Sequence, residues 1–275
     1  MKQDLTETAV RDALKSKWIG GHYQYLESTA STNDLLKEQV AAGSSSDPPA
    51  GTVILSDYQA QGRGRLDRRW EAPAGTSLLL SILFRPDWPP IQLHWLTMLA
   101  GLAVAKAIEV QTGLSISLKW PNDVVINREG VWQKVCGILL EGHVSAEQRL
   151  EYAVLGVGIN VNIPAEMLPD TIRPATSLLI ATGHAISRLT LLAEILQRLE
   201  QNYEMADRGK SPQPMWEQRL MTIGKRVEVN FTGKIDPILG TVEGTGEWGQ
   251  LLVRDDHGHL HAIAAGDVRL SEVFL

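Results

Sequence analysis

Four arginines lie within ten residues in the segment 61-QGRGRLDRRW-70, although the chain as a whole is acidic. Gly62 and Gly64 carry no Cβ, so the backbone N–H groups beside them can approach a ligand closely. Guanidinium groups match the paired oxygens of carboxylates and phosphates. The segment supplies four of them, at Arg63, Arg65, Arg68 and Arg69. It predicts an anion-binding loop, with an exposed arginine-rich turn as the alternative.

A second polar motif, 119-KWPNDVVI-126, follows a short predicted strand. Its proline ends that strand, and the side chains of Asn122 and Asp123 then lie in a turn from which they reach backbone or ligand groups. Lys119 precedes the turn and is a candidate partner for an anion. A plain turn is the alternative interpretation.

Two further motifs lie inside predicted strands. Lys134 opens the apolar run 134-KVCGILLEG-142, where it is either a solvated strand end or a second anion ligand. The run 156-GVGINVN-162 lacks the third glycine and the following helix of a dinucleotide fingerprint. Its glycines indicate instead a close approach of another backbone or a ligand.

The composition restricts what these motifs can do. The chain has 275 residues, a net charge of −6 and 44% hydrophobic residues, which suits a globular protein with a large core. A net negative surface argues against general binding of nucleic acids or membrane surfaces. One cysteine, Cys136, excludes an intrachain disulfide and favours a reducing compartment. We see no signal peptide or membrane span and predict a cytoplasmic protein.

Hydrophobic periodicity predicts the elements that position the motifs. Helices are expected in four segments after an N-terminal one at 5–17: 31–43, 92–113, 190–207 and 213–221. Ser31 is the expected N-cap of the second helix and Gly43 its stop. Strands are expected at 22–27, 52–58, 76–85, 115–120, 123–128, 132–144 and 151–163. From Gly224 on, four or five short strands indicate a small β module. The chain is thus predicted to be α+β, with domains at 1–222 and 223–275.

The order and separation of these motifs resemble the biotin protein ligase family over nearly the whole chain. The resemblance rests on STN at 31–33, GRGR at 62–65, KWPND at 119–123, GINVN at 158–162 and GDVRL at 266–270. It implies a class II synthetase-like catalytic domain, with a mixed β-sheet and flanking helices, followed by a small SH3-like β-barrel domain. It also implies that biotin and Mg-ATP give biotinoyl-5′-AMP, whose acyl group passes to a lysine of a biotin carboxyl carrier protein.

The resemblance assigns roles residue by residue. Biotin would be bound by Ser31, Thr32, Asn33, Gln59, Gly62, Arg63 and Gly137. The nucleotide would be bound by Arg65, Arg68, Trp70, Asn122, Lys134, Asn160 and Arg269. Catalysis would depend on Arg63, Arg65, Lys134, Lys119 and Asp123. Mg²⁺ is expected with ATP, without a dedicated protein site, and the histidines at 257, 259 and 261 are expected on one face of an exposed strand.

The sequence departs from the family in two places. Leu66 and Asp67 stand where the family loop has Arg-Gly, so we expect altered retention of the adenylate, to be tested with Asp67→Gly. About twenty residues precede the first core strand, too few for the winged-helix domain of some family members. We therefore predict no specific DNA binding. Family members often form homodimers through a sheet edge, which makes a homodimer possible here.

Two other functions stay open at this point. Lipoate–protein ligase shares the fold and the adenylation chemistry, although the GRGR loop and the GDVRL ending favour biotin. A catalytically silent biotin-binding regulator is the second alternative. Such a protein would release no pyrophosphate, and the presence of Arg63, Arg65, Lys119 and Lys134 argues against it.

Overall fold

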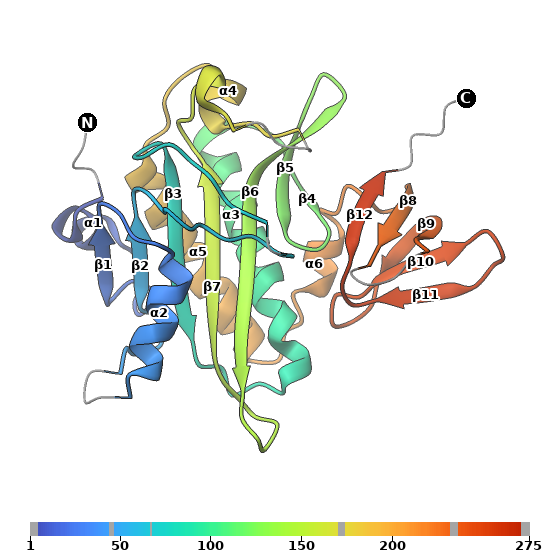
Figure 1. Ribbon diagram of the computed structural model, residues 1–275, viewed down its shortest axis with the longest axis horizontal. Coiled ribbons are helices and arrows are strands. Elements are labelled where there is room, and N and C mark those ends of the chain that lie inside the picture. The colour runs from blue at the N-terminus through green and yellow to red at the C-terminus, as the bar shows by residue number, and fades with distance from the viewer. Residues whose placement is uncertain (1–4, 44–46, 67, 170–173, 232–235, 271–275) are drawn as a thin grey trace.

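The computed structural model describes residues 5–43, 47–66, 68–169, 174–231 and 236–270 (Figure 1). Two β-sheets organise this part of the chain, a seven-stranded sheet with helices on both faces and a five-stranded sheet near the C-terminus. The prediction of an α+β fold with a mixed sheet, flanking helices and a second, small β unit is confirmed. The boundary between the two domains at residue 222 stays a prediction.

The seven-stranded sheet has the order β1-β2-β3-β7-β6-β5-β4. It is mixed because β1 pairs with β2 in parallel, whereas the other neighbours are antiparallel. The strands are β1 (Tyr23–Leu26), β2 (Val53–Ser56), β3 (Ser77–Phe84), β4 (Ile116–Lys119), β5 (Asp123–Arg128), β6 (Val131–Val144) and β7 (Leu150–Asn160). All eight residues of β3 are buried, as expected of a central strand covered on both faces.

Helices cover the two faces of this sheet according to the alternation of side chains along its strands. They are α1 (Glu7–Ala13), α2 (Thr32–Ala41), α3 (His94–Thr112), α4 (Leu178–Thr182), α5 (Arg188–Asp207) and α6 (Gln213–Glu217), with 3₁₀ turns at Pro90–Leu93 and Ala165–Met167. On one face α2 packs on Ile54, Leu83 and Val154 through Leu36. The intervening residues face α3 and α5, where the main core forms.

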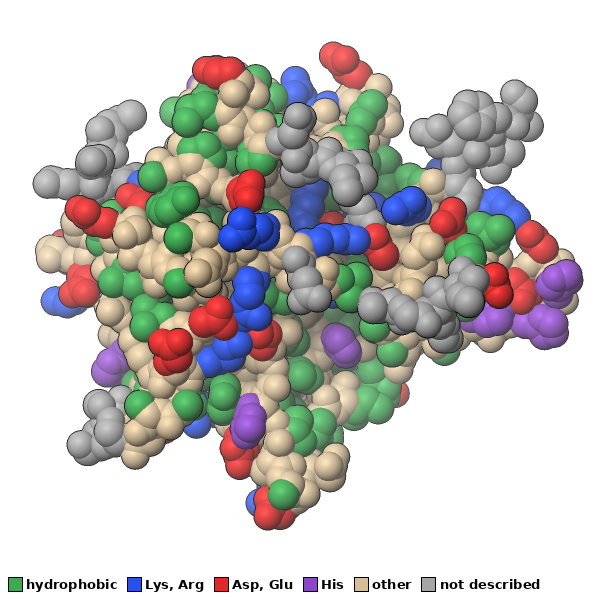
Figure 2. All heavy atoms as spheres, in the orientation of Figure 1, with side chains coloured by type: hydrophobic (Ala, Val, Ile, Leu, Met, Phe, Trp, Pro, Cys, Tyr) green, Lys and Arg blue, Asp and Glu red, His purple; other side chains and the backbone are tan. Residues whose placement is uncertain are grey.

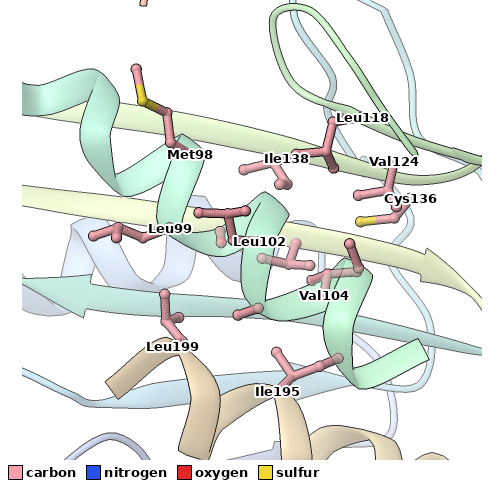
Figure 3. Close-up of a cluster of buried hydrophobic side chains, with 14 of the residues drawn as sticks. Met98, Leu99, Leu102, Val104, Leu118, Val124, Cys136, Ile138, Ile195 and Leu199 are labelled. Atoms are coloured by element: carbon pink, nitrogen blue, oxygen red, sulfur yellow. The ribbon is translucent and has the colours of Figure 1, made fainter. Parts of the chain in front are cut away.

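The main core lies between α3, α5 and the sheet (Figure 3). In Figure 3, Met98, Leu99, Leu102 and Val104 of α3 meet Leu118, Val124, Cys136 and Ile138 of the strands, and Ile195 and Leu199 of α5 lie on the other side. Residues 90–112 have the length and hydropathy of a membrane span, so the prediction that no segment has them was wrong. Because 67% of its most apolar 18-residue stretch is buried inside the protein, this segment matches a core helix.

The C-terminal sheet has the order β11-β10-β9-β8-β12 and is antiparallel throughout. Its strands are β8 (Arg226–Asn230), β9 (Ile238–Thr245), β10 (Leu251–Asp255), β11 (Leu260–Ile263) and β12 (Asp267–Leu270). The indole of Trp95, in α3, stacks on Trp248 with ring centroids 5.7 Å apart. The Nε1 of Trp120 donates to the Gly249 carbonyl at 2.9 Å. These contacts hold the small sheet against the larger one.

Several predicted ends of helices and strands were wrong, and for two helices the reason is a contact with a distant part of the chain. Helix α1 ends at Ala13 because the N–H groups of residues 17–19 bond to the Glu200 carboxylate instead of continuing the helix. Helix α6 ends at Glu217 because residues 219–221 pair with Leu118 of β4. Strand β7 ends at Asn160, and α4 was missed.

The prediction for the start and stop of α2 is confirmed, whereas the prediction that the three histidines share a strand is wrong. The Ser31 hydroxyl accepts the N–H of Asp34, and Gly43 has φ 57° just beyond the helix, as predicted. The three histidines do not share a strand, because His257 and His259 lie in the turn before β11. The carboxylate of Asp255 organises that turn by accepting the N–H groups of both residues at 2.9 Å.

Candidate active site

A cavity of about 470 Å³ lies where the arginine loop (residues 61–70), the large sheet and the C-terminal sheet meet. Figure 2 shows basic side chains with acidic ones beside them across the middle of this face. Fourteen of the sixteen predicted site residues line the cavity: Ser31, Thr32, Asn33, Gln59, Arg63, Arg65, Arg68, Trp70, Asn122, Asp123, Lys134, Gly137, Asn160 and Arg269. Gly62 and Lys119 are not among the lining residues.

The arginine loop is a hairpin closed by backbone pairing. Arg63 and Arg69 form an antiparallel bridge, Gly64 donates its N–H to the Arg68 carbonyl at 2.7 Å, and Trp70 donates to the Gly62 carbonyl at 2.9 Å. A Cβ on Gly62 would collide with the carbonyl of Trp70, so this glycine allows the two arms to pair. At the tip, Leu66 has φ 55°, a left-handed conformation that favours glycine. Asp67 lies outside the described residues.

Trp70 covers the floor of the cavity. Gly137 and Gly158 are paired across β6 and β7, and a Cβ on either would lie within 2.8 Å of the indole. The Nε1 of Trp70 is buried and has no hydrogen-bond partner in the described part of the chain. The Nζ of Lys134 lies 5.2 Å from the centroid of the Trp70 ring, a cation–π distance. The glycines therefore admit the indole, and Lys134 lies above it.

The turn after β4 positions two cations. The Nζ of Lys134 lies 2.6 Å from the Oδ1 of Asp123, whose residue is only 9% exposed. Asn122 donates its Nδ2 to the Ile138 carbonyl at 2.6 Å, and its Oδ1 accepts from the Nη1 of Arg65 at 3.3 Å. Burial lowers the pKa of Arg65, while the charges of Asp123 and Asp267 oppose this shift. Asn122 and Asp123 thus orient Arg65 and Lys134.

The C-terminal sheet contributes one wall of the cavity through Gly266, Asp267 and Arg269. The Nη2 of Arg68 lies 2.7 Å from the Oδ2 of Asp267 and connects the arginine loop to β12. Elsewhere, Asn160 lies at the end of β7 and donates its Nδ2 to the Thr176 carbonyl at 3.0 Å. Lys119 lies at the end of β4, opposite Asp123 in the register.

A buried polar cluster forms the opposite end of the cavity. Gln59 accepts both the N–H and the Oγ1 hydroxyl of Thr32 through its Oε1, at 2.7 and 3.0 Å. The Ser81 hydroxyl lies 2.7 Å from the Oγ1 of Thr32 and 2.5 Å from the Oδ1 of Asn33. A Cβ on Gly156 would lie 2.5 Å from the same Asn33 oxygen. In the GVG motif, Gly156 leaves room for Asn33 and Gly158 leaves room for Trp70.

Sequence reasoning missed three residues beside the cavity. Ser81 lies inside a buried apolar strand, where its hydroxyl was the only signal. Asp34 lies in the first turn of α2, and Glu141 interrupts the apolar run of β6. Both carboxylates bond to Arg63. Within the described ranges, no group of three or more His, Cys, Asp or Glu side chains is arranged to hold a metal ion.

Comparison with known proteins gives consistent matches. A sequence model of the biotin/lipoate A/B protein ligase family matches residues 25–160. A biotin–[acetyl-CoA-carboxylase] ligase of Mycobacterium tuberculosis is 34% identical over 98% of this chain and 96% of its own length. The bifunctional ligase/repressor BirA of Bacillus spizizenii is 32% identical over 97% of this chain and 79% of its own length.

A solved structure is similar over most of the fold. The biotin protein ligase from Aquifex aeolicus in complex with biotin and ATP has a TM-score of 0.73 and 30% sequence identity to this chain. The match covers 91% of this chain and 100% of that one. It therefore includes most of the fold.

Proposed function

The chain belongs to the biotin/lipoate A/B protein ligase family, and from this membership we propose that it is a biotin protein ligase. An oxygen of the biotin carboxylate attacks the α-phosphorus of ATP, the bond to pyrophosphate breaks, and biotinoyl-5′-AMP forms. The amine of a carrier lysine then attacks the acyl carbon, AMP leaves, and the amine releases a proton. The carrier is a biotin carboxyl carrier protein or domain of a biotin-dependent carboxylase.

One observation supports this chemistry most directly: two oriented cations share a cavity with an apolar floor. The first step brings a carboxylate up to a triphosphate, and these anions repel each other. Lys134 and Arg65, held by Asp123 and Asn122, lie in the cavity where they offset this repulsion. Because the cations are fixed before substrate binds, they stabilise charge in the transition state without reorganisation.

We propose that biotin occupies the end of the cavity between α2 and the floor. The ureido head matches the polar cluster, where Ser31, Thr32, Asn33 and Gln59 supply donors and acceptors. The apolar rings match the indole of Trp70, and Gly137 acts in this scheme by leaving room for that indole. Arg63 lies next to this end and is assigned to the carboxylate. Gly62 acts in this scheme by closing the hairpin that carries Arg63.

The nucleotide is assigned to the other end of the cavity. Arg68 and Arg269 lie there on the loop and on β12, and Asn160 lies at the end of β7. Lys119 is assigned to the surroundings of Asp123, which it opposes in the register. Mg²⁺ would enter with ATP and would neutralise phosphate charge. Asp123 lies beside Lys134, and the described residues offer no group of three ligands for a resident ion.

The test is pyrophosphate release with Mg-ATP and biotin, run beside lipoate, followed by the intact mass of an added carrier domain. We expect biotin-dependent release and the mass of one biotin on the carrier. Lys134→Gln is expected to lower the rate about a hundredfold or more, because it removes a fixed cation from the transition state. The matched control is Lys106→Gln, since Lys106 is 51% exposed on α3.

Each outcome is decisive. Release with lipoate and none with biotin would assign the protein to lipoate ligation. Biotin binding without release from either acid would indicate a silent biotin-binding regulator. Equal rates for the Lys134 and Lys106 variants would remove Lys134 from the mechanism.

We further propose a cytoplasmic enzyme without a DNA or membrane partner. The single cysteine is buried in β6, and a net charge of −6 opposes polyanion binding. A tight, salt-sensitive complex with DNA would contradict this. The outer edge of β1 is the candidate surface for a homodimer, since β1 ends the large sheet and the opposite edge strand, β4, pairs with Leu220. Sedimentation equilibrium of the full chain tests the dimer.

A further inference from the structure

Glu141 lies on β6, four residues beyond Gly137, and its carboxylate joins three elements. It accepts a hydrogen bond from the Nδ2 of Asn33 at 2.8 Å and from the Nζ of Lys37 at 2.8 Å, both on α2. It also accepts from the Nη2 of Arg63 on the arginine loop, at 2.9 and 3.0 Å. The side chain is 25% exposed, so solvent screens these contacts only in part.

Asp34 completes a closed set of charges with Glu141. Its Oδ1 lies 2.6 Å from the Nη2 of Arg63 and 2.9 Å from the Nζ of Lys37. Two carboxylates and two cations are therefore balanced, and each carboxylate contacts both cations. Burial raises the pKa of Glu141. Hydrogen bonds from Lys37 and Asn33, together with the charges of Lys37 and Arg63, lower the pKa by more than burial raises it, so the net shift is downward. The Glu141 carboxylate therefore stays ionised at neutral pH.

The cluster connects two groups that line the cavity from different parts of the chain. Asn33 is fixed on its other side by the Ser81 hydroxyl, at 2.5 Å, and by the small residue Gly156. Arg63 is carried by the hairpin and makes its contacts with Asp34 and Glu141 through Nη2 alone. Within the described chain its other guanidinium nitrogens form no hydrogen bond, so a second edge of the group is available to an anion.

We infer that Glu141 is a positioning residue of the ligase. Its carboxylate ties Arg63 of the arginine loop to Asn33 at the start of α2, so that the loop is held over biotin and the adenylate. This inference rests on the proposed function of the cavity. A surface ion pair without this role would contribute little, because exposed pairs lose most of their interaction energy to solvent. Here one carboxylate holds two cavity residues from segments thirty positions apart.

The first test uses Glu141→Gln, which keeps the size and the hydrogen-bonding capacity toward Asn33 but removes the charge that holds Arg63. We expect KM for biotin to rise about tenfold with kcat within about twofold, because the interaction is made equally in ground and transition states. The preformed adenylate should leave the enzyme about ten times faster. Glu243→Gln is the matched control, since it breaks an arginine–carboxylate pair with Arg254 on the C-terminal sheet.

A double-mutant cycle separates action through Arg63 from other effects. In an Arg63→Gln background, Glu141→Gln should add no further rise in KM, because its partner is already absent. Multiplying effects would overturn the inference, since Glu141 would then act without Arg63. Unchanged KM and unchanged adenylate release in Glu141→Gln would overturn it as well.

Limited trypsin digestion gives a readout that needs no catalysis. Trypsin cleaves after arginine, and the loop holds four arginines between residues 61 and 70. Cleavage in the loop should be several times faster in Glu141→Gln than in wild type or Glu243→Gln, and equal rates would contradict the loop-holding role. Wild type that releases no pyrophosphate with biotin would instead overturn the proposed function, whatever the digestion shows.

Discussion

Trp70 lies against Gly158 so closely that no side chain fits between them. A Cβ on Gly158 would lie 2.6 Å from the Cε2 of the indole and 2.9 Å from its Nε1. Gly137, the partner of Gly158 in the register of β6 and β7, stands in the same relation to the other end of the ring. Gly137 and Gly158 thus serve one purpose here, which is to admit the tryptophan at the end of the arginine loop.

Gly158→Ala should displace the indole and damage the site while the fold survives. The added methyl group overlaps Trp70, and such overpacking forces a neighbouring side chain to move. We expect kcat/KM for biotin to fall about a hundredfold, because misplaced binding groups lose most of their effect. The control is Gly101→Ala in α3, whose new Cβ would lie an ordinary 3.5 Å from Leu118. Wild-type kinetics in Gly158→Ala would show that the position of Trp70 is unimportant.

Asp267→Asn should strengthen ATP binding. Asp267 is a carboxylate in the wall of a cavity assigned to a triphosphate, and it holds Arg68 at 2.7 Å. Without its charge, Arg68 is available to the phosphates and a like-charge repulsion is removed, so KM for ATP should fall about threefold. The Arg68 side chain is 52% exposed, and we expect unfolding free energy to change by less than about 1 kcal/mol. A rise in KM for ATP would mean that the pair is needed to close the site.

Local signals made part of this structure predictable from the sequence. The start of α2 depends on the Ser31 hydroxyl and its stop on Gly43, both within a few residues of the helix. The continuous apolar run at 76–85 predicted the buried central strand β3. The family resemblance as a whole, and not any single turn or strand, predicted the fourteen site residues that line one cavity.

Long-range pairing explains what the sequence did not reveal. Gly62 was assigned to the ligand, but its lack of a Cβ allows the loop to pair with Trp70 eight residues later. Glu141 and Ser81 contact Asn33 only because β6 and β3 place them beside α2. Their sequence context is an ordinary buried strand, so no local pattern marks the carboxylate or the hydroxyl as a partner of Asn33.

Glu200→Ala should destabilise the fold without affecting the site. The carboxylate of Glu200 is 5% exposed and accepts the N–H groups of Lys17, Trp18 and Ile19 at 2.7–3.0 Å. Removing it leaves three N–H groups without an acceptor, and we expect the free energy of unfolding to fall by about 3 kcal/mol. Urea denaturation measures this change. Glu204→Ala, one turn further along α5 and 38% exposed, should change it by less than about 0.5 kcal/mol. Similar losses in both variants would refute the capping role.

Tyr25 should make the protein sensitive to alkali. Burial, together with the hydrogen bond to Asp57 and its negative charge, raises the pKa of Tyr25 to about 12. The Oη of Tyr25 donates to the Oδ2 of Asp57 at 2.8 Å, and Arg188 holds the other carboxylate oxygen at 2.7 Å. Because the folded chain binds this proton more tightly, its stabilisation is complete below about pH 10 and is lost as the pH rises through about 12.

Tyr25→Phe tests this linkage, because it removes the titrating hydroxyl and keeps the ring. We expect the unfolding free energy of wild type, measured with urea from pH 8 to pH 12, to fall more steeply above pH 10 than that of Tyr25→Phe. Tyr58→Phe is the control, since Tyr58 is 42% exposed, and it should follow the wild-type curve. Burial also raises the pKa of Tyr23 and Tyr203, so some loss of stability should persist in Tyr25→Phe. Parallel curves for wild type and Tyr25→Phe would show that the Tyr25–Asp57 bond contributes nothing to the alkaline loss.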